Sequence, residues 1–198
     1  MNNYPKFFDA IKPIALQDKL AAFLGAFENG LYEVSYLDVV KNAGHSCPTV
    51  AGAYLLCQKG LEALYGDQPA QRGEIEVAFK ESELEGVAGV IANVVSHITG
   101  ATDKTGFKGI GGNFVRHSLM HFEANIDASI KLTRTDTQQS VTLLYNPNTI
   151  KPDPKQQEIM QKIMQNIATQ EDKKEFATLW QDRVKRIFQN SDQVITVV

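Results

Sequence analysis

The stretch NAGHSCPTVAGAYLLCQKGLEALYG, residues 42–66, predicts a long helix at the centre of the fold. Pro48 suits the first position of a helix, which makes Cys47 the residue that caps it. Apolar side chains then recur every three or four residues: Val50, Tyr54, Cys57, Leu61 and Leu64. This spacing is typical of an amphipathic helix with one buried face. We therefore expect a helix over residues 48–65 that ends at Gly66.

Outward from this helix, the chain changes its periodicity several times. A helix is predicted over residues 14–29, followed by a short one over 36–44 capped by Ser35. Residues 75–79 alternate apolar and polar side chains, as a half-buried strand does. Residues 87–100 favour a buried helix, although their Val and Ile content also allows a strand. Three strands are expected next, over residues 114–126, 128–134 and 140–147. Two helices follow, one over 155–168 and one from 170 onward that is capped by Thr169, and a last strand over 192–198 ends the chain.

This order shows no steady alternation of strand and helix, so we expect an α+β fold with a mainly antiparallel sheet packed with several helices. The 198 residues suffice for one domain. We divide it into an N-terminal helical extension (1–34), a core (35–150) and a C-terminal part (151–198) with helices and the last strand.

The composition narrows the class of protein. Hydrophobic residues make up 43% and charged residues 22% of the chain, with a net charge of −3. These values are typical of a soluble globular protein, and the lack of a long basic run argues against nucleic-acid binding. The sequence shows neither a signal peptide nor an apolar stretch long enough for a membrane span. We expect a cytoplasmic protein whose two cysteines remain reduced.

His45 and Cys47 are the strongest candidates for a functional site. Imidazole nitrogen and thiolate sulfur are ligands that suit zinc and iron. The two residues share one turn, and the N-terminus of a helix favours negative charge on the sulfur. The same residues also fit a plain helix cap with a surface histidine, so the sequence leaves both interpretations open.

The other cysteine and the remaining histidines are weaker candidates. Cys57 lies about 15 Å along the helix from Cys47, too far to share an ion, and falls in the apolar stripe. His97 stands near the predicted end of a buried helix, and we select it as a third metal ligand. His117 and His121, about 13 Å apart on a strand, are its alternatives. The glycines in GFKGIGGN, residues 106–113, fit no phosphate-binding motif and indicate a turn.

The stretch GHSCPTVAGAYLLCQKGLEALYG resembles the opening motif of the FmdE family of formylmethanofuran dehydrogenase proteins, a Gly-His-x-Cys-Pro-Gly turn before a helix. Gly44, His45, Cys47 and Pro48 match, whereas Thr49 replaces the last glycine. The similarity continues through IEVAFKESELEGVAGVIANVVSHITGAT and the C-terminal segments to residue 198. Ala101 stands where the family's second motif has a cysteine, and this chain lacks the cysteine-rich zinc module that many members carry.

The resemblance implies an α+β fold, a homodimer and a bound divalent metal, zinc or alternatively iron, with room for a small-molecule ligand in the metal cleft. It favours a metal-binding protein accessory to a redox or metallocofactor system. Two other classes remain open at this point. One is an enzyme that uses Cys47 as nucleophile or a metal-bound water; the other is a structural domain whose turn is only a cap.

Overall fold

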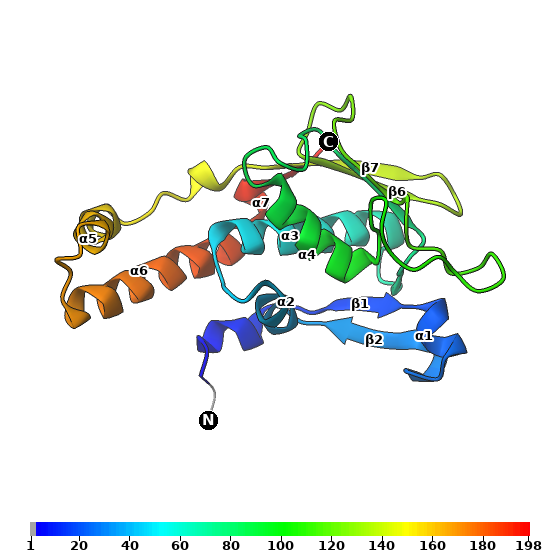
Figure 1. The fold of residues 1–198 in the computed structure, drawn as a ribbon, viewed down its shortest axis with the longest axis horizontal. Coiled ribbons are helices and arrows are strands. Elements are labelled where there is room, and N and C mark those ends of the chain that lie inside the picture. Colours follow the sequence, from blue (N-terminus) through cyan, green and yellow to red (C-terminus); the bar gives the residue numbers. More distant parts are fainter. Residues whose placement is uncertain (1–2) are drawn as a thin grey trace.

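Two β-sheets lie on opposite sides of a central helical layer in the computed structural model, which describes residues 3–198 (Figure 1). The five-stranded sheet has the order β5 (Met120–His121), β4 (Ile75–Phe79), β6 (Ile130–Arg134), β7 (Ser140–Tyr145) and β8 (Ile195–Val197). The three-stranded sheet has the order β2 (Leu31–Val34), β1 (Ile14–Gln17) and β3 (Ala70–Gln71). Only β4–β5 and β1–β3 are parallel pairs in this described part of the chain. The predicted α+β class is confirmed, although the strands form two sheets rather than one.

Helix α3 (Pro48–Tyr65) is the centre of this arrangement, as its sequence predicts. It contacts β7 and α4 (Ala88–Thr99), and most of its residues are buried. Gly52 allows the sheet to approach closely, because a Cβ atom there would lie 2.2 Å from the Tyr145 ring. Gly60 likewise allows a close approach, because a Cβ atom there would lie 2.5 Å from the Leu132 side chain. The small residues of α3 therefore determine how closely helix and sheet pack.

The predicted helix over residues 14–29 is wrong. Its first residues form β1, which pairs with β2 on one side and β3 on the other. Only α1 (Lys19–Phe23) is helical, and the turn η2 (Glu28–Gly30) leads into β2. Ile14 and Leu16 alternate with less buried residues, so strand pairing outweighs helical periodicity here. Residues 3–34 are thus mainly a strand pair with a short helix, preceded by the 3₁₀ turn η1 (Lys6–Ala10).

The predicted strand over residues 114–126 is also wrong, apart from the two residues of β5. Phe114 and Ser118 have φ angles of 63° and 59°, which a regular strand does not allow. The loop is fixed by its own backbone instead. The N–H of Arg116 donates to the Phe107 carbonyl at 2.9 Å, and the Arg116 carbonyl accepts from the Thr102 N–H at 2.9 Å. The glycine-rich segment 106–113 belongs to this loop.

The remaining helices flank α3. Helix α2 (Tyr36–Ala43) begins with a Ser35–Asp38 capping box and ends at Gly44 with φ 75°. The turn η3 (Pro147–Thr149) precedes α5 (Pro154–Met164), α6 (Gln170–Gln189) and α7 (Ser191–Val194). Helix α6 packs on α5 and on α3, and Thr169 caps it as expected. Within residues 3–198, no helix has both the length and the apolar character that a membrane crossing needs.

Candidate functional site

His45 follows the end of α2 and presents one free ring nitrogen. Its Nδ1 lies 3.0 Å from the Ala43 carbonyl oxygen. A carbonyl oxygen can only accept, so Nδ1 carries the proton and donates. In the neutral imidazole this leaves a lone pair on Nε2, and the His45 residue is exposed. Metal-binding histidines are commonly oriented by such a second hydrogen bond.

Cys47 caps α3, as the sequence predicts. Its backbone is extended, and its Sγ accepts a hydrogen bond from the Val50 N–H at 3.4 Å. The residue is only partly buried and its thiol is free. The sulfur thus completes the first turn of the helix and remains within reach of solvent.

Ser46, between the two candidates, fixes the turn to the rest of the fold. Its carbonyl accepts hydrogen bonds from Trp180 Nε1 at 3.0 Å and Gln181 Nε2 at 3.1 Å, both on α6. Its hydroxyl lies 2.9 Å from the Tyr36 hydroxyl on α2. The Tyr145 hydroxyl from β7 donates to the Pro48 carbonyl at 2.6 Å. Side chains from three elements therefore hold the backbone around His45 and Cys47 in place.

His97 lies on α4 in different surroundings. Burial, with a smaller contribution from the Arg72 guanidinium, lowers its pKa, while Asp38 acts in the opposite direction. Arg72 Nη2 donates to the His97 carbonyl at 3.1 Å. The imidazole of His97 therefore stays neutral to a lower pH than a free histidine does, but the positively charged Arg72 lies beside it.

The structure does not join the three predicted ligands into one site. Among residues 3–198, no group of three or more His, Cys, Asp or Glu side chains is arranged to hold a metal ion. His45 and Cys47 share a turn, whereas His97 is placed by a separate helix. His117 lies 3.0 Å from the Ser118 hydroxyl, and His121 is exposed on β5. As a metal site, the turn alone supplies two donors.

Cys57 is a core residue, as predicted. It is 0% exposed on the buried face of α3. Burial raises the pKa of its thiol well above the usual range. The thiol is therefore protonated at neutral pH and packs as a small apolar group.

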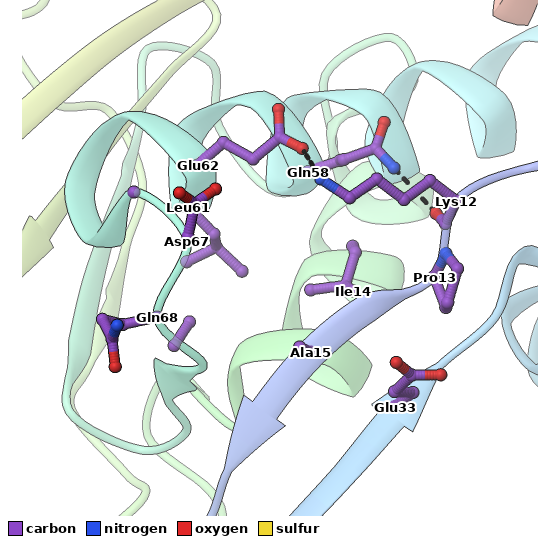
Figure 2. Close-up of a pocket in the computed structure, with 12 residues that line it drawn as sticks. Lys12, Pro13, Ile14, Ala15, Glu33, Gln58, Leu61, Glu62, Asp67 and Gln68 are labelled. Carbon is purple, nitrogen blue, oxygen red and sulfur yellow. Dashed lines mark hydrogen bonds and ion pairs between the residues drawn. The ribbon is translucent and has the colours of Figure 1, made fainter.

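A cavity of about 330 Å³ lies between β1 and the C-terminal half of α3 (Figure 2). Figure 2 shows Lys12 reaching Glu62, with Nζ and Oε1 2.8 Å apart, beside Gln58. Glu33 and Asp67 also line it. None of the residues lining this cavity is His45, Cys47 or His97, so it is separate from the predicted metal ligands.

A second feature was not predicted from the sequence: two arginines meet one buried carboxylate. Asp18 caps α1 and accepts from Arg72 Nη1 at 3.0 Å and from Arg116 Nη2 at 2.6 Å. The three residues are far apart in the sequence, and no local motif connects them. The signal that the sequence offers is Asp18 itself, a helix-capping residue type inside the predicted helix.

The chain thus combines an α+β fold with a His-x-Cys-Pro turn that side chains of α2, α6 and β7 fix before the long central helix. A comparison with protein-family models matches residues 43–197 to the family described as "FmdE, Molybdenum formylmethanofuran dehydrogenase operon". The match covers most of the chain, so the chain belongs to the FmdE family. No curated protein matches the sequence.

Proposed function

We propose that this FmdE-family chain binds one divalent metal, zinc or alternatively iron, through His45 Nε2 and Cys47 Sγ. The hydrogen bond from His45 Nδ1 to the Ala43 carbonyl carries the proposal, because it leaves the exposed Nε2 as the lone-pair donor. The partly exposed thiol of Cys47 follows two residues later. Nitrogen and sulfur are the donor types that zinc prefers.

The two donors fit a metal only as half of a coordination shell. A zinc ion takes four ligands, and residues 3–198 bring no third His, Cys, Asp or Glu into such a group. We assign the open positions to water, to a small-molecule ligand or to a second copy of the chain in a homodimer. The Arg72 guanidinium beside His97 repels a cation, so His97 is a weaker source of the third ligand.

Metal analysis of three single variants tests the proposal. Purified wild-type protein, treated with chelator and then titrated with Zn²⁺, should take up metal, whereas His45→Ala and Cys47→Ser should each lose this uptake. Cys57→Ala is the matched control, because it removes the other thiol from the buried core and should keep the metal. Uptake that is unchanged in Cys47→Ser, or absent in the wild type, overturns the proposal.

A catalytic role is the second candidate, and the open coordination positions favour it. A metal with open positions supplies Lewis-acid chemistry, whereas closed sites are structural. Within this chain, Ser46 and its α6 partners would keep His45 and Cys47 in a fixed orientation. The family's description refers to an operon for a molybdenum enzyme, and this supports a role accessory to a redox or metallocofactor system. We also propose that the protein acts in the cytoplasm.

A further inference from the structure

The two arginines that meet Asp18 leave hydrogen-bonding capacity unused. Arg116 Nε and Nη1 and Arg72 Nε are buried and have no partner among the described residues. The Arg116 side chain is only 8% exposed, and the Arg72 side chain is 24% exposed. Buried donors are almost always paired, because an unpaired one has given up its hydrogen bonds to water without a replacement. These nitrogens are therefore packed against the protein, and the positive charge of both guanidiniums is left without a second counter-charge.

The charges around Asp18 do not balance. One carboxylate faces two guanidiniums. Burial alone would raise the pKa of Asp18, but Arg116 and Arg72 outweigh it and keep that pKa below its usual value. Burial lowers the pKa of Arg116, although Asp18 opposes this shift. With both arginines charged and Asp18 ionised, the cluster retains one excess positive charge in a largely buried place.

A small cavity opens beside the two arginine side chains. It measures about 210 Å³, and both arginines line it together with the end of the glycine-rich loop. The other lining residues come from two further segments and from that loop: Lys19, Gly73, Glu74, Asn113, Phe114 and Val115. The charges of Lys19 and Glu74 cancel, since Lys19 Nζ lies 2.5 Å from Glu74 Oε1. The excess positive charge of the cluster is thus what the cavity offers to a ligand.

Two glycines keep this cavity's arginines in place. A Cβ atom on Gly73 would lie 1.2 Å from Arg116 Nη1, and one on Gly100 would lie 3.1 Å from the same nitrogen. The φ angles of 84° and 76° at these positions suit glycine. The guanidinium of Arg116 therefore lies directly against backbone, in a position that a larger residue at 73 would block.

We infer that the cavity formed by Arg72, Arg116 and the loop at Asn113 binds the anionic oxygen group of a small molecule, a carboxylate or a phosphate. Planar guanidinium donors match both groups in geometry. The ligand would neutralise the excess positive charge of the Asp18, Arg72 and Arg116 cluster. This site is independent of the proposed metal turn, because its charge attracts anions and excludes cations.

Titration of the full-length protein with acetate and with inorganic phosphate, each against chloride at matched ionic strength, tests the inference. The ¹⁵N resonances of the arginine Nε–H groups report binding directly, and the melting temperature reports it independently. In the wild type, we expect the Arg72 and Arg116 resonances to shift in a saturable manner with at least one of the two anions. The stronger of the two responses identifies the oxyanion class.

Arg72→Lys is the main variant, because it keeps the charge beside Asp18 but removes the planar guanidinium from the cavity lining. It should weaken anion binding by about tenfold or more, the effect of one lost charge-assisted hydrogen bond. Arg116→Lys should also weaken anion binding. If Arg116→Lys does not fold, the result for Arg72→Lys alone tests the inference. Arg134→Lys is the control, since Arg134 pairs with Asp136 on β6 and lines no part of this cavity. The inference is overturned if neither anion shifts the wild-type resonances more than chloride does. It is also overturned if Arg72→Lys binds the anion as well as the wild type.

Discussion

Replacing Asp18 with Asn should destabilise the fold strongly, although the two side chains have nearly the same shape. Asn caps a helix about as well as Asp, so α1 keeps its cap and only the charge is lost. Asp18 and Arg116 have side chains that are 5% and 8% exposed. Leaving a buried charge without its partner costs roughly 3–5 kcal/mol. Arg72 is more accessible to water, so we expect a loss of about 3 kcal/mol in the free energy of unfolding.

Urea denaturation at pH 7 measures this loss, with Asp136→Asn as the control. Asp136 pairs with Arg134 at the surface, and exposed ion pairs contribute about 0–1 kcal/mol. The pH dependence gives a second measurement. Since the pKa of Asp18 is lowered in the folded state, its contribution is present above the unfolded value near 4 and declines as the pH falls through the folded one. A loss below about 1 kcal/mol at pH 7 would refute the view that Asp18 neutralises a buried cation.

Two further substitutions test the packing of α3 and the state of His97. Gly52→Ala should cost about 2 kcal/mol in urea denaturation, because its Cβ would lie 2.2 Å from the Tyr145 ring, and the cost should shrink in a Tyr145→Ala background. The lowered pKa of His97 means that the unfolded chain binds the proton more readily, so stability falls as the pH drops below about 6.5. His97→Gln should reduce the stability difference between pH 7.5 and 5.5, and the exposed His121→Gln should not; equal differences in wild type and His97→Gln would contradict this.

The helices that carry their own signals could be predicted from the sequence. The helix over residues 48–65 has a proline start, a cysteine cap and an apolar stripe, and all three appear in α3. Thr169 and Ser35 each begin a helix through a capping box, as their local sequences indicate. These features depend on neighbours within four residues, so a single sequence contains the information.

The segment 14–29 shows where local periodicity fails. Its apolar residues fit a helix, but β1 forms because Ile14 and Leu16 find partners in β2 and in β3. The most distant of those partners, Ala70, lies 54 residues from Leu16, and periodicity within a short window does not detect it. Phe23 and Leu24, two of the apolar residues that share a face in the predicted helix, are 62% and 63% exposed.

The candidate sites also differ in how much of them the sequence predicts. His45 and Cys47 are neighbours in the sequence, so their common turn could be predicted, whereas the orientation of Nε2 required the Ala43 contact. The Asp18 cluster could not be predicted, because residue 18 meets residues 72 and 116 only in the folded chain. The glycine-rich loop indicated a turn, but its sequence did not reveal that it brings Arg116 to Asp18.

The two proposed sites require ligands of opposite charge, and the fold keeps them apart. The metal turn is at the start of α3, whereas Asp18 precedes α1, and Figure 1 shows α3 beginning left of centre and α1 at the right of the view. Arg72 adds an electrostatic reason, because the same guanidinium that faces the anion cavity also lies beside His97. A cation bound at His97 would be repelled by Arg72, and an anion bound in the cavity would reduce this repulsion. We therefore expect the metal at His45 and Cys47 and the oxyanion at Arg72 and Arg116. In this arrangement, neither ligand is repelled by the charged side chains around it.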